Sequence, residues 1–185
     1  MKTLLALAFA VLVTHGPQHE AVSEFAILTD GKLAEGYDLG VDTSEQQRDW
    51  VETTNGYLRC KYPRGQKWGA VFIAVGQINP DVDSRQSKDL TPFRYLVLEA
   101  RGLKGGERAS VGMKAKGDPD SGQEPKYRLH LSKDWKRFKI ALSKFTDDSY
   151  SRKRLRSTYI PFELVFEPSD PSETIDVKNV RVLAE

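Results

Sequence analysis

Short runs in which apolar and polar residues alternate are the feature that most constrains how this chain can fold. In each run every second residue is apolar, as with Leu58, Cys60 and Tyr62. Successive side chains of a β-strand point to opposite sides, so this period predicts strands with one buried and one solvated face. The runs are 56–62, 95–102, 109–115, 126–132, 137–142, 162–167 and 174–183.

The segments between these runs are rich in Gly, Pro, Asp and Asn, which favour tight turns. One of them, "GLKGGE" (102–107), is expected to be a hairpin turn between the strands on either side of it. The run 68–76 is apolar on both sides, which predicts a strand inside a sheet and not at its edge. Seven to nine half-polar strands at this spacing predict an all-β fold of two packed antiparallel sheets.

The first residues of the chain have the pattern of a secretory signal peptide. Lys2 supplies the positive start, and the apolar run from Leu4 to Val13 follows it. This run is too short to cross a bilayer, which takes about 20 residues. We therefore predict a signal peptide over 1–16, a flexible segment over 17–23 and one folded domain over 24–185, in a protein that is periplasmic or secreted.

Charge and cysteine content restrict the possible partners. The chain has 185 residues, one cysteine and a formal net charge of +2, which argues against nucleic acid as the main partner. No run after the signal is apolar enough to predict membrane insertion. We expect a monomer and leave a protein partner open. The basic cluster at 151–156 has two interpretations, a solvated loop or a site for an acidic polymer.

A set of features in the second half of the chain has a characteristic order. In sequence these are Arg101–Gly102 at a strand end, the turn Gly105–Gly106–Glu107, Val111–Gly112 in the next strand, Trp135 before a later strand, and Asn179–Val180 in the last one. This order resembles a bacterial carbohydrate-binding module of the galactose-binding-like jelly-roll family. The resemblance covers most of residues 25–185.

The resemblance implies a jelly-roll β-sandwich that binds polysaccharide or oligosaccharide on one sheet face or its rim. Many such modules also hold a structural calcium ion between the last strand and the first. Here Lys178 and Asn179 stand where an acidic pair is common, while Asp176 precedes them and Asp30 lies near the first strand. Because calcium takes six to eight oxygen ligands, we expect no cofactor and leave a structural calcium open.

Sugar recognition uses flat aromatic rings together with planar polar side chains that bond to hydroxyl groups. If consecutive strands pair as neighbours, several polar side chains reach one sheet face, where arginine and carboxylate groups suit vicinal hydroxyls. A basic face would also suit acidic glycans, and a solvated outer face is the competing interpretation. The predicted ligand-binding residues are Trp68, Tyr95, Glu99, Arg101, Lys114, Arg128 and His130.

The three tryptophans receive different assignments. Trp68 begins the run 68–76 and shares a side with Ala70 and Ala74, whose small side chains would leave its ring accessible. Trp135 directly precedes a strand and is expected to pack a turn. Trp50 fits a binding site and a structural role equally well.

Catalysis has little support in the sequence. Glycoside hydrolysis usually needs two placed carboxylates, and the polar strand sides offer Glu99, Glu163 and Glu167 without a sign that any two converge. Neither a G-x-S-x-G nor an H-E-x-x-H motif occurs. We therefore predict an exported, non-catalytic carbohydrate-binding protein. The alternative is an envelope structural or protein-interaction module that does not bind sugar; a lyase or hydrolase would require a charged neighbour of Glu99 or Glu163 in a cleft.

Overall fold

The computed structural model of the chain describes residues 23–78, 80–119, 121–147, 152–168 and 173–185. The predicted signal peptide and residues 17–22 of the predicted flexible segment lie outside these ranges, and the first strand starts at Glu24. Within the described ranges, no helix has both the length and the apolar character needed to cross a bilayer.

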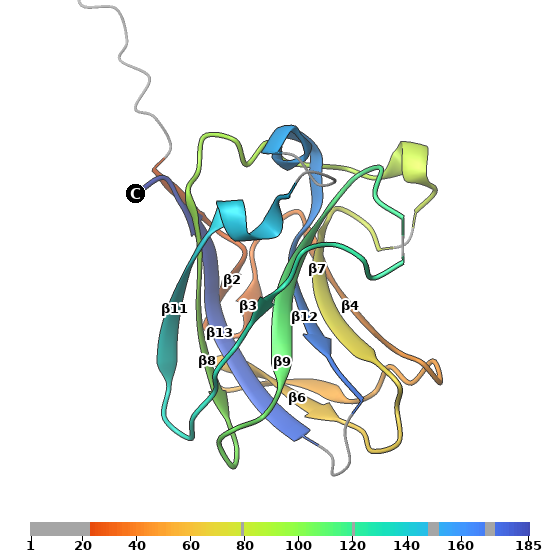
Figure 1. Cartoon of the computed structure of the whole chain (residues 1–185), viewed down its shortest axis with the longest axis vertical. Coiled ribbons are helices and arrows are strands. Elements are labelled where there is room, and N and C mark those ends of the chain that lie inside the picture. Colours follow the sequence, from red (N-terminus) through yellow and green to blue (C-terminus); the bar gives the residue numbers. More distant parts are fainter. Residues whose placement is uncertain (1–22, 79, 120, 148–151, 169–172) are drawn as a thin grey trace, which may run out of the picture.

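Two antiparallel sheets make up most of the molecule (Figure 1). The six-stranded sheet has the order β11 (Lys136–Ala141), β8 (Tyr95–Gly102), β13 (Glu173–Leu183), β6 (Tyr57–Tyr62) and β5 (Val51–Thr54), with β1 (Glu24–Ala26) also paired to β13. The five-stranded sheet has the order β10 (Tyr127–Arg128), β9 (Ala109–Ala115), β12 (Thr158–Phe166), β7 (Gly69–Val75) and β4 (Tyr37–Thr43). Two short strands, β2 (Leu28–Thr29) and β3 (Lys32–Leu33), form a small third sheet.

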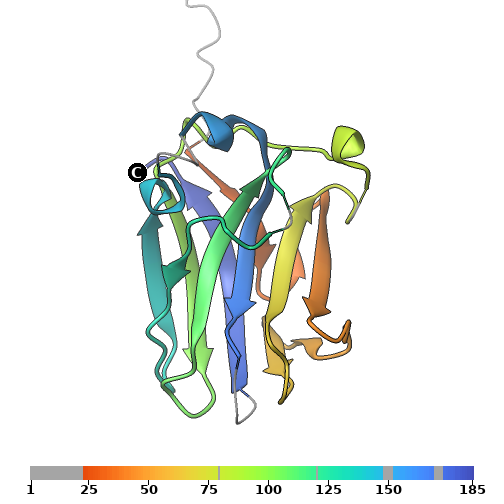
Figure 2. The same cartoon turned by 45° about the vertical axis from the view of Figure 1, so that its right-hand side comes forward.

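The 3₁₀ helices of the described residues all lie at the same end of the sandwich (Figures 1 and 2). They span Val82–Ser84, Leu142–Phe145 and Arg152–Ser157. The last of them contains most of the basic cluster predicted at 151–156. Its Leu155 is buried and its Arg154 forms an ion pair with Asp118, so this segment is anchored in the fold, while Lys153 and Arg156 are exposed to solvent.

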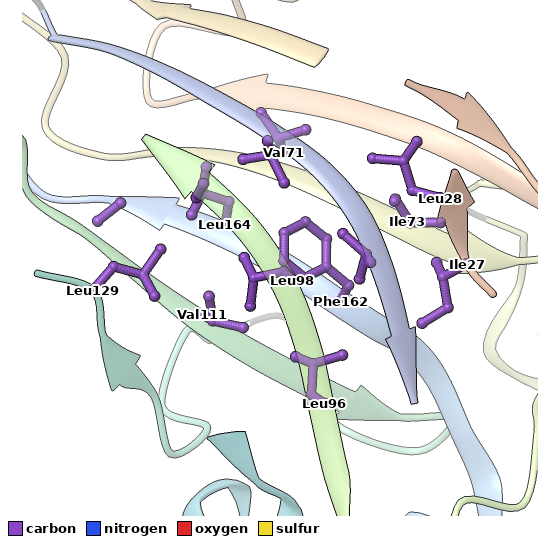
Figure 3. Packing of buried hydrophobic residues seen from close by; sticks show 14 of the residues in the cluster. Ile27, Leu28, Val71, Ile73, Leu96, Leu98, Val111, Leu129, Phe162 and Leu164 are labelled. Carbon is purple, nitrogen blue, oxygen red and sulfur yellow. The ribbon is translucent and has the colours of Figure 1, made fainter. Parts of the chain in front are cut away.

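The apolar sides of the strands meet between the two large sheets. Figure 3 shows Leu96 and Leu98 of β8 in the same cluster as Val111 of β9 and Phe162 of β12. Each large aliphatic or aromatic side chain removed from water in this way contributes about 1.5–3 kcal/mol. The alternation predicted from the sequence is therefore confirmed, and with it the jelly-roll sandwich class.

An aromatic group closes one part of this core. The rings of Tyr62 and Phe166 stack with centroids 4.7 Å apart, and Trp50 packs edge-on against both at 5.6 and 5.3 Å. Trp50 is only 6% exposed. Of its two possible roles, the structural one is therefore correct.

The strand order corrects one expectation and confirms another. β7 is paired on both sides, with β12 and β4, as its apolar character predicted. The segment 102–107 is not a hairpin turn, because β8 and β9 belong to different sheets. Both edges of β8 are already taken by β11 and β13, so the chain crosses to the other layer. In this crossing Glu107 folds back against Gly102, where any larger side chain would collide with it, and accepts the Lys104 N–H.

Candidate functional site

The predicted ligand-binding residues do not share one face, because they come from both sheets. Tyr95, Glu99 and Arg101 lie on the outer side of the six-stranded sheet, on β8. The other four belong to the five-stranded sheet or its margin and are Trp68, Lys114, Arg128 and His130. The expectation of a single polar face was wrong for the same reason as the hairpin: consecutive strands β8 and β9 are not neighbours.

The outer side of the five-stranded sheet, called here the five-stranded face, is ordered in rows by its strand register. One row consists of Arg128, Ser110, Val165, Ala70 and Asp42. The next consists of Gly112, Glu163, Phe72 and Gly40. Five strands about 4.8 Å apart make a surface roughly 19 Å wide, bordered by charge and small or apolar in its middle.

Trp68 lies at one end of this face. It directly precedes β7, its backbone carbonyl accepts the Ser44 N–H at 3.0 Å, and alternation places it on the same side as Ala70 and Phe72. The opposite side of β7 is core, with Val71 and Ile73 buried. Trp68 is 46% exposed, and none of the ring or cation contacts among the described residues involves it. A large ring is thus left open to a flat ligand.

Glycines at two positions shape the middle of the five-stranded face. The Phe72 ring lies across Gly40 of β4, and the Glu163 side chain lies across Gly112 of β9. At both glycines a β-carbon would overlap the neighbouring side chain. The missing side chains therefore let Phe72 and Glu163 lie flat along the sheet.

Glu163 is a buried carboxyl group in the centre of this face, 3% exposed. Burial, together with a hydrogen bond to Glu124, raises the pKa of Glu163 to about 8. Burial opposes ionisation of Glu124 as well, but hydrogen bonds from Glu163 and Lys126 outweigh it and lower the pKa of Glu124 below its usual value. Glu163 therefore carries a proton at neutral pH and donates it to the Glu124 carboxylate.

The proton accounts for two buried atoms that would otherwise be unsatisfied. With both groups ionised, Glu163 Oε1 and Glu124 Oε2 are buried and have no hydrogen-bond donor among the described residues. Lys126 Nζ holds the other side of Glu124 at 2.7 Å. Two carboxyls that bond to each other are closer than the roughly 5 Å or more that separates the pair in glycosidases. This convergence therefore does not support hydrolysis.

The remaining predicted residues of this sheet lie around its border. Arg128 is 3.5 Å from Glu167, and Lys114 exerts its charge on Glu163 and Glu124. His130 lies past the end of β10, beside a hollow of about 280 Å³ lined by Gly106, Glu107, Arg108, Arg128, Leu129, His130 and Leu131. Its backbone carbonyl accepts a bond from Lys136. His130 is therefore at the end of the sheet and not among the central rows.

The outer side of the six-stranded sheet, called here the six-stranded face, is built around Asp176 of β13. This carboxylate is 2% exposed and lies between two arginines of neighbouring strands. Arg59 donates Nε and Nη2 to it at 2.8 and 3.0 Å, and Arg101 donates Nε at 2.9 Å. The charged residues Glu99 and Arg101 of β8 thus belong to a cross-strand network, in which Glu99 accepts a bond from Asn179 and pairs with Lys178.

Aromatic rings on the six-stranded face are covered by cations. The Arg101 guanidinium carbon is 4.7 Å from the Trp135 ring centroid and 5.5 Å from that of Tyr57. Lys178 Nζ lies 4.5 Å from the centroid of the Trp135 ring. The rings of Trp135 and Tyr57 meet edge to face, with their centroids 5.6 Å apart. Lys139 lies over Tyr95 at 4.1 Å. These rings are therefore engaged, unlike Trp68.

Asp176 also bears on the calcium that the sequence left open. Its carboxylate is held by two guanidinium groups, and the Asp30 N–H is bonded to the Asn179 side chain. Within the described residues, no three His, Cys, Asp or Glu side chains are grouped so that they could hold a metal ion. The Asp176 carboxylate considered for calcium thus has other partners.

Sequence reasoning missed several residues that the fold brings to the two faces. Tyr57 and Arg59 come from a run whose apolar side alone drew attention, and Trp135 was assigned to turn packing. Phe72 could have been found from the alternation within 68–76, which marks it as outward, whereas Glu163 was already placed on a polar strand side and was considered only for catalysis. Cys60 was read correctly: it is buried, and burial raises the pKa of its thiol.

Comparison with known proteins finds similarity in structure alone. No family model matches the sequence, and no curated protein matches it significantly. A family 30 carbohydrate binding module has a similar structure, with a TM-score of 0.61, 13% sequence identity, and 89% of each chain covered. A family 29 module variant has a TM-score of 0.56 at 12% identity over 88% of this chain and 93% of that one. Another family 29 variant, solved with cellulohexaose, has a TM-score of 0.55 at 11% identity, covering 89% of this chain and 94% of that one. The likeness shows that this chain has the β-sandwich fold of carbohydrate-binding modules.

Proposed function

We propose that this protein is an exported, non-catalytic module that binds a polysaccharide or oligosaccharide on its five-stranded face. The observation that carries the proposal is the open ring of Trp68, at the end of a face whose middle is small or apolar. The fold shared with carbohydrate-binding modules supports it. Trp68 would stack on a sugar ring, since pyranose faces present C–H groups to which an aromatic surface is complementary.

The rows of the five-stranded face supply the other elements of such a site. Ala70 and Val165 leave a low surface beside Trp68, and Phe72 extends it by lying flat on Gly40. Arg128 and Asp42 border this surface on opposite sides, where their planar groups can bond to hydroxyls. An oligosaccharide would therefore cross the strands with its rings over the apolar middle and its hydroxyl groups toward the charged borders.

Stacking on a sugar requires an aromatic ring that is not covered by another group, and the two faces differ in this property. On the six-stranded face Arg101 and Lys178 occupy the surface of Trp135, so a neutral sugar would have to displace a bound cation. On the five-stranded face Trp68 has no such competitor among the described residues. The predicted residues Tyr95, Glu99 and Arg101 are accordingly placed outside the proposed neutral-sugar site.

Replacing Trp68 with alanine should weaken glycan binding by about tenfold or more, because aromatic anchors of this kind contribute about 1.4 kcal/mol or more to binding. The measurement is isothermal titration with cellohexaose and mannohexaose, preceded by affinity electrophoresis on neutral and acidic polysaccharides. The fold should be unchanged, since the Trp68 side chain is substantially exposed.

Tyr95→Ala is the matched control, because it removes an aromatic ring from the opposite face. It should leave the affinity within twofold of the unmodified protein. Folded protein that is retarded by no glycan would refute the proposed function. Capture of an envelope protein, insensitive to added sugar, would then favour the interaction-module alternative.

A further inference from the structure

The six-stranded face carries a clear excess of positive charge. Register places on its strands the cations Arg59, Lys61, Arg101, Arg137, Lys139, Lys178 and Arg181, and the carboxylates Glu24, Glu52, Glu99 and Asp176. Seven cations thus face four anions. Register places on the strands of the five-stranded face two cations, Lys114 and Arg128, and two ionised carboxylates, Asp38 and Asp42, since Glu163 holds a proton. The six-stranded face therefore carries a net positive charge, whereas the charges on the strands of the five-stranded face balance.

The Arg101 guanidinium group is held through its Nε and its flat face, which leaves its two terminal nitrogens available. Its Nε is bonded to Asp176, and its guanidinium plane is packed against Trp135 and Tyr57. The two terminal nitrogens of Arg101 have no hydrogen-bond partner among the described residues. These are the two donors that bind a carboxylate or sulfate in parallel, and their orientation is fixed before any ligand arrives.

Further cations surround this fork at the spacing of adjacent strands. Lys178 lies on the neighbouring strand β13 and shares the Trp135 ring with Arg101. Arg137 and Lys139 lie on the exposed edge strand β11, and neither forms an ion pair within the described part of the chain. The cations thus form a band across β11, β8 and β13, which a single small anion would not span.

We propose that the six-stranded face binds the sulfate or carboxylate groups of an anionic polysaccharide, with Arg101 as the oriented fork and Lys178, Arg137 and Lys139 as supporting charges. Charge complementarity selects this occupant, and the covered rings of Trp135 and Tyr57 disfavour a neutral one. This inference does not depend on the proposed function, because it concerns the opposite face of the molecule.

The test compares dextran sulfate with uncharged dextran, and polygalacturonate as the carboxylate counterpart, by affinity electrophoresis at two salt concentrations. Retardation is expected with the charged polymers alone and should weaken as salt rises, because exposed charges are screened. Which of the two polymers binds more tightly identifies the source of the anionic group. Retardation by dextran equal to that by dextran sulfate would overturn the proposal.

The variant Arg137→Gln/Lys139→Gln removes two exposed charges without touching Asp176, and should lower dextran sulfate affinity by about fivefold. Arg101→Gln should have at least that effect, with folding checked by circular dichroism. The control Lys114→Gln/Arg128→Gln removes the same charge from the five-stranded face and should change affinity by less than about twofold. An equal loss in the control, or equally tight binding of duplex DNA, would mean non-specific attraction of polyanions and would refute the site. Trp68→Ala should leave this binding intact.

Discussion

Asp176→Asn should lower the free energy of unfolding by about 3 kcal/mol, because removing one partner from a buried ion pair leaves the other charges uncompensated. The carboxylate is 2% exposed and accepts three hydrogen bonds from Arg59 and Arg101. Asparagine keeps the shape but replaces one acceptor oxygen with an amide that points donors at a guanidinium. The two arginines are partly exposed, so water recovers a portion of the loss and the effect stays at the low end of the range for buried pairs.

Urea unfolding followed by tryptophan fluorescence measures this loss. Glu52→Gln is the matched control, since Glu52 pairs with Lys61 on the same face but both side chains are largely exposed. Exposed pairs contribute about 0–1 kcal/mol, so the control should shift the midpoint only slightly. Equal shifts in the two variants would mean that Asp176 contributes no more than a surface charge. A triple change, Arg59→Gln/Arg101→Gln/Asp176→Asn, should recover part of the loss by removing the stranded charges.

The alternation of residues was sufficient to predict which side of each strand is buried, but not which strands are neighbours. Leu96, Leu98 and Ala100 face inward as their period predicted, and Glu99 and Arg101 face outward. Period two is a property of a single strand and is indifferent to its partner. Pairing is decided by which edges remain free, and β8 takes its partners from β11 and β13, which lie far along the chain.

Predicting the candidate sites required knowledge of which strands are neighbours, but to a different degree for each site. Trp68 was assigned from its own strand, because small residues share its side and β-branched ones the other, and its exposure agrees with that prediction. The network around Asp176 could not be assigned, since Arg59, Arg101 and Asp176 come from three strands whose adjacency follows from the topology alone. Glu163 shows a further limit: its position predicts an outward carboxylate, but Gly112 leaves room for it to lie flat and Glu124 covers it.

Because Glu163 is buried and bonded to Glu124, the stability of the protein above pH 5 depends on the protonation of this one carboxyl group. The pKa of Glu163 is about 8 in the folded protein, against 4.5 for the free side chain. Between these values the folded state keeps a proton that the unfolded state has released, so stability falls as pH rises. The loss is absent below pH 4.5 and complete above about pH 8. Glu124 has a lowered pKa and contributes in the opposite sense, but only below its ordinary value, so measurements above pH 5 isolate Glu163.

The free energy of unfolding of the Glu163→Gln variant, relative to that of the unmodified protein, should therefore rise by up to about 1.4 kcal/mol for each pH unit between 5 and 8. Glutamine cannot ionise, and its amide can donate to Glu124 in place of the shared proton. Urea unfolding at pH 5, 6, 7, 8 and 9 gives the difference directly. The control is Glu167→Gln, because Glu167 lies on the same face but is exposed. The difference in free energy of unfolding between this variant and the unmodified protein should not change with pH. A flat difference for Glu163→Gln as well would mean that Glu163 is ionised at neutral pH. The five-stranded face would then carry a buried negative charge at its centre, and hydroxyl donors of a sugar would have a stronger acceptor there than a shared proton leaves available.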